Sequence, residues 1–581
     1  MSDSFPGPED QADNDTNTPR RLPVDGNVAG RLSMVASLAP GAIAIAEPDG
    51  PPQPDGLRSY SLTTFGSLDQ RSDDIARGLI AWGVQPGMRL AMLVPFGAGF
   101  IELVFALMKA GVVTILVDPG MGRKHLIRCL SAAEPDGFIG IPKAQAVRSV
   151  LRRRFPKAKW NVTVGRRLFW GGKTLSQIAD MGKAQHESLP FPRVNRVDEA
   201  AVIFTTGSTG PPKGVLYTHG IFHAQIDRIR ERYDIHRGSR DLACFPLFGL
   251  FDAVMGVTTI IPDMDPTQPA AVNPERLIEA ATQWEIDQAF GSPALWNTVV
   301  RWAEARNTTR PFPTLKRILS AGAPVPADTL VKLRELVHPE ANIMTPYGAT
   351  EALPVASIES REVIAETGPA SLKGKGTCVG TRFEGVAWRI IEINDGPVTD
   401  IRETTELERG KIGELMVTGP MVTEKYVVRS DQNSLHKVAD GKRTWHRMGD
   451  VGYLDARDRF WFCGRKAHRV TSGTRTLFTV PCEAIFNAHP AIYRSALVPR
   501  GKRPSQKPVM IVEPHADQMP ISTENRDHLR NELLELASRN PLTRKITEVI
   551  IWDKPLPVDI RHNSKIFREK LAEQINNDNP Q

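Results

Sequence analysis

The stretch VIFTTGSTGPPKG, residues 202–214, decides the fold class of this chain. Its apolar start, Val202–Phe204, is typical of a buried strand, and a loop rich in Thr, Ser and Gly follows. Backbone N–H groups and hydroxyls in such a loop can surround phosphate oxygens, and Lys213 can add a positive charge. The loop is predicted to bind phosphate through Thr205, Thr206, Gly207, Ser208, Thr209, Gly210 and Lys213.

This loop differs from the Walker loop of nucleotide hydrolases. The Walker motif needs Ser or Thr after its lysine and a helix behind it, whereas Lys213 precedes Gly214 and the strand-like Val215–Tyr217. A flexible turn without function would explain the Ser and Gly residues but not the Pro-Pro-Lys-Gly ending. The motifs elsewhere in the chain are therefore needed to identify the reaction in which this phosphate loop takes part.

Length and composition describe an ordinary globular protein of several domains. The chain has 581 residues, 41% apolar and 24% charged, and at roughly 100–200 residues per domain it can hold two to four domains. The net charge of +7 favours anionic ligands only weakly, so no nucleic-acid partner is expected. Residues 1–28 are polar and are predicted to form a disordered tail. They do not resemble a secretory signal, so a cytoplasmic location is expected.

Helical and strand-like patterns alternate after the tail. They follow one another at residues 67–82, 90–94, 100–110 and 112–117. This alternation predicts an α/β fold with a largely parallel sheet. The most apolar stretch, Leu90–Met108, contains Pro95 and Glu102, so it is predicted to be a buried strand and helix and no membrane span.

Three further groups of motifs accompany the phosphate loop. In chain order they are Tyr347-Gly348-Ala349-Thr350-Glu351, Gly449-Asp450 followed by Cys463-Gly464-Arg465, and Asp559-Ile560-Arg561-His562-Asn563-Ser564-Lys565. Together with the loop, they resemble the motifs of the adenylate-forming superfamily, which includes acyl-CoA synthetases, luciferases and peptide-synthetase adenylation domains. The resemblance implies an AMP-forming ligase that uses ATP and Mg²⁺ to activate a carboxylic acid.

The resemblance also implies which residues bind the nucleotide. The ring of Tyr347 flanks adenine, Asp450 bonds the ribose hydroxyls, and Arg465 approaches the ribose and phosphate. A strand-end loop, residues 320–324, lines the adenine site. Beyond the phosphate loop, the implied set is Gly322, Ala323, Pro324, Tyr347, Gly348, Ala349, Thr350, Asp450 and Arg465.

Three residues are implied to be catalytic: Lys565, Thr350 and Glu351. Formation of an acyl adenylate places negative charge around the α-phosphate as pyrophosphate leaves, and cations in a dry site stabilise that charge. Lys565 supplies one of these charges, Thr350 contacts the phosphate, and Glu351 is the metal ligand for magnesium. The substrate carboxylate attacks directly, so no protein nucleophile is needed.

The superfamily resemblance implies an α/β architecture of two folded parts. A large N-terminal AMP-binding domain with mixed and parallel sheets is expected at residues 29–464, and a small mobile α+β lid at 465–581. In relatives, the residue two positions after the arginine is usually a charged hinge, but this chain has Ala467 there, next to Lys466. The hinge therefore lies one residue earlier or differs.

Other segments resemble the β-lactone synthetases of bacterial long-chain olefin biosynthesis, over about residues 31–571. They are residues 245–252, 261–267, 445–450 and 558–571. In the first, Gly249 stands where many acyl-CoA synthetases carry His, and is expected to leave room. The resemblance implies a long-chain β-hydroxy acid with an alkyl branch at the α-carbon, whose own hydroxyl expels AMP to close a β-lactone.

The implied substrate pocket consists of His219, Phe248, Gly249, Phe251, Gly291 and Ser292. The base that closes the ring is not identified. The resemblance implies that His219 shapes the acyl pocket, and hydrogen-bonded packing of the motif loops is the alternative role for His446 and His562. Implied partners are the other olefin-pathway enzymes, a decarboxylase and a reductase, and peripheral contact with a membrane is a further expectation.

Two other functions remain open for this chain. One is a long-chain fatty acyl-CoA ligase or acyl-AMP ligase, which belongs to the same superfamily. The other is a nonenzymatic adenylate-binding or scaffold subunit, but decay would be expected to alter at least one of Lys213, Glu351, Asp450, Arg465 and Lys565, and all five are present.

Overall fold

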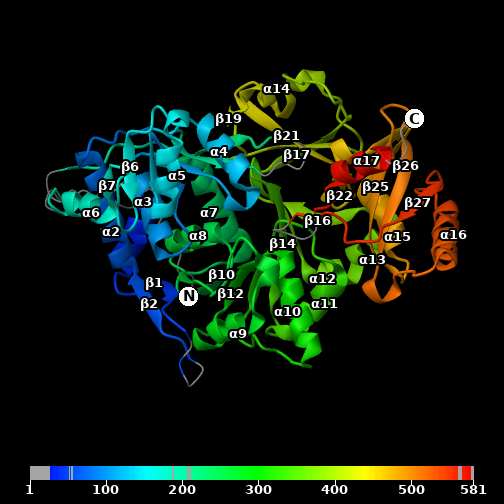
Figure 1. Cartoon of the computed structure of the whole chain (residues 1–581), viewed down its shortest axis with the longest axis horizontal. Helices are drawn as coiled ribbons and strands as arrows, with labels where there is room; N and C mark the ends of the chain where they lie inside the picture. Colours follow the sequence, from blue (N-terminus) through cyan, green and yellow to red (C-terminus); the bar gives the residue numbers. More distant parts are fainter. Residues whose placement is uncertain are drawn as a thin grey trace. The chain divides into compact units, whose positions relative to one another are not determined.

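The computed structural model describes residues 26–51, 53, 57–185, 189–205, 211–559 and 565–577 (Figure 1). The described chain divides into two compact units. The first takes the described residues up to 205 together with 212–263 and 426–429. The second takes 264–425 and the described residues from 430 onward. The predicted boundary near residue 464 is a different division and stays a prediction.

The main sheet of the first unit confirms the parallel α/β pattern. Strands β8, β4, β3, β5, β6 and β7 are parallel neighbours in that order, and β9 and β19 continue the sheet antiparallel beyond β8. The strands are β3 (Arg89–Leu93), β4 (Val113–Leu116), β5 (Gly137–Gly140), β6 (Trp160–Thr163), β7 (Lys173–Thr174), β8 (Glu199–Phe204), β9 (Gly214–Thr218) and β19 (Tyr426–Val428).

A second group of strands in this unit is smaller. Strands β10 (Arg240–Ala243), β11 (Thr258–Ile260) and β1 (Ile43–Pro48) are parallel, and β2 (Tyr60–Thr64) pairs antiparallel with β1. The helices of the unit are α1 (Gly30–Leu38), α2 (Phe65–Ala81), α3 (Ala98–Lys109), α4 (Arg123–Ala132), α5 (Pro142–Val150), α6 (Leu175–Lys183), α7 (His219–Tyr233) and α8 (Pro246–Met255).

Local sequence explains where these helices begin. Thr64 caps α2 by accepting the backbone N–H of Ser67, whose hydroxyl bonds back to the Thr64 N–H, a reciprocal capping box. Helix α3 ends at Lys109, which is fully buried and donates to Asp69 and Asp73 of α2 at 2.5 and 2.6 Å. A buried ammonium needs such partners, so this group joins α2 to α3.

Residues 26–28 belong to the folded part of the chain, although the sequence predicts that they lie in the tail. Residues 26–28 were assigned to the disordered tail, but Asn27 and Val28 are only 1% and 3% exposed. The Asn27 amide donates to the Met108 carbonyl at 2.6 Å. The short polar and Gly residues hide this packing in the sequence. Residues 1–25 lie outside the described residues.

One long sheet forms the frame of the second unit. Strands β12, β13 and β14 are parallel, and β15, β16, β22, β21, β18 and β17 continue antiparallel in that order, with β20 beside β21. Their bounds are β12 (Gln288–Gly291), β13 (Arg317–Ser320), β14 (Asn342–Ala349), β15 (Ala352–Glu359), β16 (Thr377–Arg382), β17 (Ala387–Ile391), β18 (Gly413–Thr418), β20 (Lys437–Asp440), β21 (Arg443–Leu454) and β22 (Arg459–Arg465).

The helices before residue 465 in this unit include three long ones. They are α9 (Pro274–Gln283), α10 (Pro293–Ala305) and α11 (Ala327–Leu336), and the shorter ones are α12 (Ser360–Glu362), α13 (Gly368–Ala370) and α14 (Asn433–His436). Helix α10 packs through Trp296, which is fully buried and meets the ring of Phe312 edge-on at 6.4 Å.

The C-terminal segment has hydrophobic cores of its own. Strands β25 (Ile492–Arg500), β26 (Lys507–Pro514) and β27 (Glu548–Ile551) form a sheet, and β23 (Val470–Ser472) pairs with β24 (Arg475–Leu477). Alternate residues of β25 face opposite sides, so one face packs on α15 (Thr479–Asn487) and α16 (Thr523–Arg539), and the other on α17 (Arg568–Asn577). This α+β arrangement fits the predicted lid, whose mobility stays a prediction.

Two findings concern the described residues as a whole. Within the described ranges, no helix is both long enough and apolar enough to cross a membrane. All five cysteines are buried and none forms a disulfide.

Candidate active site

The phosphate loop joins two antiparallel strands, as the sequence predicts. Strand β8 ends at Phe204, β9 begins at Gly214, and the Thr205 N–H donates to the Lys213 carbonyl at 3.1 Å to close the base of the loop. Thr205 is buried, and its hydroxyl makes no hydrogen bond with the described residues. The other predicted phosphate ligands, Thr206, Gly207, Ser208, Thr209 and Gly210, lie outside the described residues.

Lys213 lies against an aromatic ring that sequence reasoning missed. Its Nζ is 4.8 Å from the ring centroid of Tyr426, a side chain only 1% exposed. Tyr426 is placed there because β19 pairs with β9, with Tyr426 opposite Val215. A cation above an aromatic face is attracted by the ring quadrupole, so the ring fixes where this charge lies. Tyr426 is about 210 residues away in sequence, and only the strand pairing reveals it.

Loss of this ring should weaken the use of ATP. Tyr426→Leu removes the cation–π contact, which contributes about 0.5–2 kcal/mol, so kcat/KM for ATP should fall by about 2–30-fold. Tyr426→Phe keeps the ring face and should retain most of the activity. Steady-state kinetics with varied ATP measures both variants. Equal losses in the two variants would argue against the ring's action on Lys213.

Three strand ends bring predicted site segments to one edge of the sheet in the second unit. Strands β12, β13 and β14 are parallel, so their carboxyl ends meet at the same edge. Gly291 is the last residue of β12 and Ser292 follows it, the loop 322–324 follows β13, and Tyr347 lies near the end of β14. Ser292 also caps α10 by accepting the Leu295 N–H at 3.3 Å. The sequence predicted these loops, and the topology explains why they converge.

Thr350 and Glu351 form the turn between β14 and β15. Ala349 pairs with Ala352, so these two residues are the tip of a hairpin. Glu351 is 8% exposed, and its carbonyl accepts the N–H and the hydroxyl of Thr423, both at 2.9 Å. A side chain at Gly348 would bring Cβ within 2.7 Å of the Ala352 carbonyl oxygen, so glycine is needed at this close approach.

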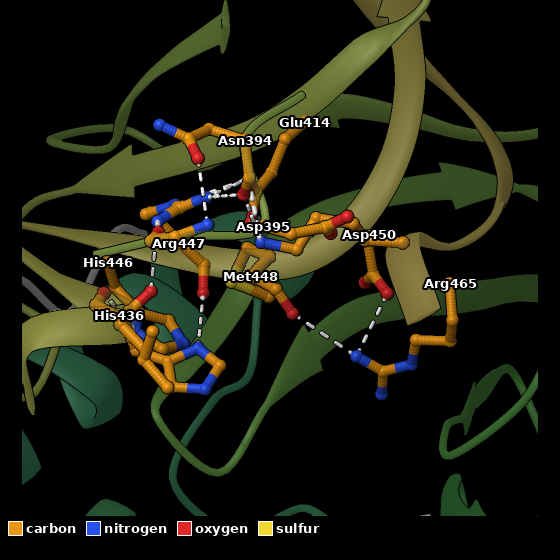
Figure 2. A network of polar contacts seen from close by, with 12 residues as sticks. Asn394, Asp395, Glu414, His436, His446, Arg447, Met448, Asp450 and Arg465 are labelled. Atoms are coloured by element: carbon orange, nitrogen blue, oxygen red, sulfur yellow. Dashed lines mark hydrogen bonds and ion pairs between the residues drawn. The ribbon is translucent and has the colours of Figure 1, made fainter. Parts of the chain in front are cut away.

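Asp450 contacts two other predicted site residues, and Figure 2 shows one of them, Arg465. The Tyr347 hydroxyl donates to its Oδ2 at 2.5 Å, and Arg465 Nη1 lies 2.9 Å from its Oδ1. Asp450 and Arg465 meet because they are opposite residues of β21 and β22. The Arg465 guanidinium also donates to the Met448 carbonyl at 3.2 Å. Tyr347, Asp450 and Arg465, predicted as one set from distant motifs, therefore do come together.

The electrostatics of Asp450 link it to the remaining motif residues. The pKa of the Asp450 carboxyl is raised, mainly because the group is buried. The charge of Arg465, the hydrogen bond from Tyr347 and the charge of Lys565 act in the opposite direction and lower this pKa. The charge of Glu351 raises it further. Burial and the Asp450 carboxylate together hold the pKa of the Tyr347 phenol well above its usual value. The cations Arg465 and Lys565 and the carboxylates Asp450 and Glu351 therefore interact with one another. Such a group of charges suits a site for a polyanion and a metal.

Lys565 is held at the base of the last motif loop. Its backbone N–H donates to Asp559 Oδ1 at 2.8 Å, and its carbonyl accepts the Asp559 N–H at 3.0 Å. The neighbouring residues Val558 and Ile566 form an antiparallel bridge. Residues 560–564 between them, including His562, lie outside the described residues. The Lys565 side chain is exposed to solvent, as a residue that meets a bound substrate must be.

Behind this site lies a buried charge network that the sequence did not reveal (Figure 2). Arg447 and Glu414 are both fully buried, with Nη2 and Oε2 2.7 Å apart. Lys466 Nζ lies 2.9 Å from Glu414 Oε1 and donates to the Asn394 carbonyl at 3.0 Å. Burial is the main cause that lowers the pKa of the Lys466 ammonium. Lys466 directly follows Arg465, so this network anchors the strand end that presents Arg465.

The predicted pocket residue Gly249 needs a correction. It was expected to leave room for substrate, but a Cβ there would lie 3.0 Å from Ile101 Cδ1, 3.3 Å from Thr259 Cγ2 and 3.4 Å from Phe96 Cζ. The space beside Gly249 on α8 is therefore filled by the protein. Phe248 and Phe251 are also buried, with ring centroids 5.8 Å apart. Glycine serves close packing here, a reason that a single sequence cannot distinguish from an open pocket.

His219, the other predicted pocket residue of this unit, packs at the start of α7. It is fully buried, and its Nδ1 accepts the N–H of Val28 at 3.3 Å. Burial, and secondarily the charge of His223, lower the pKa of His219 to about 4. His219 is therefore a packed imidazole in this structure, and its place in the substrate pocket stays a prediction.

His219 should make the protein less stable in acid. Its pKa is about 4 when folded and about 6.5 when unfolded, so below pH 6.5 the unfolded chain binds a proton that the folded chain does not. The free energy of unfolding should therefore drop by about 2 kcal/mol from this residue between pH 8 and pH 5. Urea unfolding at pH 8, 6.5 and 5 measures the drop. His219→Asn, which keeps an acceptor for Val28, should have a smaller drop, and an unchanged drop would contradict the assignment.

Comparison with known proteins agrees with this geometry. The family model described as AMP-binding enzyme matches residues 36–427. The olefin beta-lactone synthetase of Xanthomonas campestris pv. campestris is 42% identical over 552 residues, which cover 94% of this chain and 97% of that protein. The olefin beta-lactone synthetase of Stenotrophomonas maltophilia is 42% identical over 555 residues, with 94% and 97% covered.

A solved structure shows the same fold. The o-succinylbenzoate CoA synthetase of Bacillus subtilis, in complex with its acyl-adenylate intermediate, matches with a TM-score of 0.70 at 19% identity, covering 94% of this chain and 98% of that one. By its family model and its full-length relatives, this chain belongs to the AMP-binding enzymes of the adenylate-forming superfamily and, within them, to the family of the olefin β-lactone synthetases.

Proposed function

We propose that this protein is an ATP-dependent β-lactone synthetase of olefin biosynthesis. It would adenylate a long-chain 2-alkyl-3-hydroxy fatty acid and close it to a β-lactone, with release of AMP and pyrophosphate. The observation that carries this proposal is 42% identity over 94% of the chain to olefin beta-lactone synthetases. The convergence of Tyr347, Asp450, Arg465, Glu351 and Lys565 supports an intact adenylation site.

The residues around Asp450 fit a nucleoside. Asp450 Oδ1 is buried and accepts no aligned hydrogen bond from the described residues, although Arg465 lies at ion-pair distance. A buried carboxylate oxygen without a donor is costly, and a ribose hydroxyl would supply one. On this assignment Asp450 holds the ribose and Arg465 reaches toward the sugar and phosphate.

In the first half-reaction, a carboxylate oxygen of the substrate forms a bond to the α-phosphorus of ATP. The bond between the α-phosphorus and the bridging oxygen breaks, and pyrophosphate leaves with the electron pair. Lys565 and Lys213 would stabilise the added negative charge, and each aligned charge in a dry site contributes about 3 kcal/mol. Glu351, a buried carboxylate, fits a ligand for Mg²⁺, which would neutralise phosphate charge when bound.

In the second half-reaction, the acceptor is already part of the substrate. The β-hydroxyl oxygen attacks the activated carbonyl carbon, AMP leaves with the electron pair of its ester bond, and the hydroxyl proton passes to a base. Holding both groups in one molecule contributes about 7–11 kcal/mol, which offsets part of the strain of a four-membered ring. The ring-closing base is left unassigned, since His219 is buried and bonded to Val28.

The chemistry of substrate and product indicates the neighbouring reactions. A β-hydroxy acid is supplied by reduction of a β-keto acid, and a β-lactone yields an alkene when it loses carbon dioxide. A reductase and a decarboxylase are therefore the proposed neighbours, and the dependence on ATP favours the cytoplasm as the location.

Product analysis tests this proposal directly. The purified protein is incubated with ATP, Mg²⁺ and a long-chain 2-alkyl-3-hydroxy acid, with and without coenzyme A, and the organic product is identified by NMR. A β-lactone formed without coenzyme A is the expected result. A thioester formed only with coenzyme A would identify an acyl-CoA ligase instead, and adenylate without either product would identify an acyl-AMP ligase.

A further inference from the structure

Helix α5 and the loop after β6 expose large apolar side chains to solvent. Val147 and Val150 on α5 are 49% and 82% exposed, and Leu168 and Phe169 in the loop are 54% and 80% exposed. Such residues normally pack inside a protein, and a group of them on the surface is typical of an interaction site.

The same segment has a strongly one-sided charge. Residues 137–179 contain ten Lys and Arg and no Asp or Glu, although the whole chain carries 66 acidic residues for 73 basic ones. Arg152, Arg153 and Arg154 follow α5 after Leu151, and Arg166 and Arg167 directly precede Leu168; all five arginines are exposed. We call residues 147–154 and 166–169 the basic apolar face.

Helix α5 is amphipathic in the reverse sense. Lys143, Val147 and Val150 recur at helical spacing and share its exposed side. Its buried polar side chains turn the other way, as the contacts of Gln145 with β5 and β6 show. Gln145 donates to the carbonyls of Phe138 and Val162 at 3.2 and 2.8 Å. The two valines are therefore exposed because they lie on the solvent side of α5, whose opposite side is packed against the sheet.

The buried Arg148 also ties the exposed loop to α5. Its Nη2 donates to the Trp170 carbonyl at 3.1 Å, and the indole of Trp170 donates to the Thr163 hydroxyl at 2.9 Å. Phe169 meets the Trp170 ring edge-on, with centroids 5.2 Å apart. The loop with Leu168 and Phe169 is thus pinned next to α5, which makes the two segments one face.

We propose that the basic apolar face docks this enzyme on the surface of an anionic phospholipid bilayer. The arginines would bind lipid phosphates, and Phe169, Leu168 and Val150 would enter the boundary between headgroups and acyl chains. A polyanion such as a nucleic acid would bind the arginines but would leave the aliphatic side chains exposed to water. The choice of a bilayer over an acidic protein rests on the proposed function, because a two-chain acid and its lactone partition into lipid.

Vesicle flotation without ATP or substrate tests the proposal. The full chain is mixed with vesicles of phosphatidylcholine alone or with 30–40% phosphatidylglycerol, roughly the charge density of anionic leaflets. The protein should float with the anionic vesicles, remain behind with the neutral ones, and bind less as salt rises, because salt screens surface charge.

Two variants separate the charged and apolar parts of the face. The triple variant R152E/R153E/R154E should reduce partitioning by about tenfold or more, since each basic residue near an anionic surface contributes about fivefold. The double variant V150S/F169S should reduce it by about tenfold or more through lost apolar burial. The matched control K411E/K442E/K545E makes the same charge change at exposed lysines outside the face and should reduce partitioning much less.

Failure of the docking proposal can be distinguished from failure of the proposed β-lactone synthetase activity, because membrane binding and product formation are measured separately. Unchanged binding in R152E/R153E/R154E, a loss as large in the control, or no binding to anionic vesicles by the unaltered chain would overturn the docking proposal. Retention on an immobilised polyanion without vesicle binding would overturn it as well. β-Lactone formation in detergent is measured separately, and R152E/R153E/R154E should keep its rate there because the face is remote in sequence from every motif residue.

Discussion

Replacing Lys565 with alanine should reduce pyrophosphate release by about 10²–10³-fold while leaving ATP binding nearly intact. The side chain is exposed and its charge acts on Asp450, so it belongs to the polar site without being part of the protein's core. Its proposed charge is needed most when pyrophosphate leaves, and an interaction made in the transition state affects kcat more than affinity. A pyrophosphate-release assay and equilibrium ATP titration measure the two effects.

Asp450→Asn is the matched comparison for Lys565→Ala. It removes the negative charge that Tyr347 and Arg465 contact, so nucleotide affinity should fall by a larger factor than kcat. Unchanged turnover in Lys565→Ala would remove Lys565 from the mechanism. A loss of turnover with preserved affinity in Asp450→Asn would contradict the ribose assignment.

Replacing Glu414 with alanine should lower the free energy of unfolding by about 3–5 kcal/mol. Glu414 is fully buried and faces both the fully buried Arg447 and the partly buried Lys466, so its loss leaves two cations without their carboxylate. Urea unfolding followed by tryptophan fluorescence measures the change, because Trp445 lies two residues from Arg447.

The control for Glu414→Ala is a solvent-exposed ion pair. Glu134 lies 2.8 Å from Lys157, and both side chains are more than half exposed, so Glu134→Ala should leave the urea midpoint nearly unchanged. The triple variant E414M/R447M/K466M should recover much of the stability lost in Glu414→Ala, because it replaces all three charged groups with apolar groups of similar size, which need no charged partner. A small loss in Glu414→Ala would show that the network carries little stability.

Much of the fold was predictable because local patterns dominate it. The alternation of helices and strands over residues 67–117 appears in the structure as α2, β3, α3 and β4, with boundaries within two residues. The strand after Lys213, which distinguishes this loop from a Walker loop, is β9. Periodicity and turn residues act within a few positions, and a single sequence records them directly.

Site residues were predictable where a motif carries the chemistry. Tyr347, Asp450 and Arg465 are more than 100 residues apart at the extremes, yet the motif resemblance grouped them and the structure brings them into contact. Polar residues next to glycines at predicted strand ends can be recognised in a single sequence. Thr206–Gly210 belong to the same prediction and remain untested by the described residues.

Supporting residues were not predictable, because their partners are distant and carry no motif. The contact between Lys213 and Tyr426 exists only because β19 pairs with β9. The network of Arg447, Glu414 and Lys466 depends on the pairing of β18 with β21. The sequence shows that a residue is charged or aromatic, but it does not show which of these residues are buried next to one another.

The predictions that failed were statements about empty or occupied space. Gly249 was expected to open a pocket, but Ile101 and Phe96 fill the space beside it. Residues 26–28 were placed in a tail, but Asn27 bonds to Met108 in the packed core. The motifs and their order were sufficient for the family and the fold class, because these depend on residue type and local pattern. Burial, close packing and the pairing of distant charges were decided only by the tertiary structure, because they depend on which remote segments share the same volume.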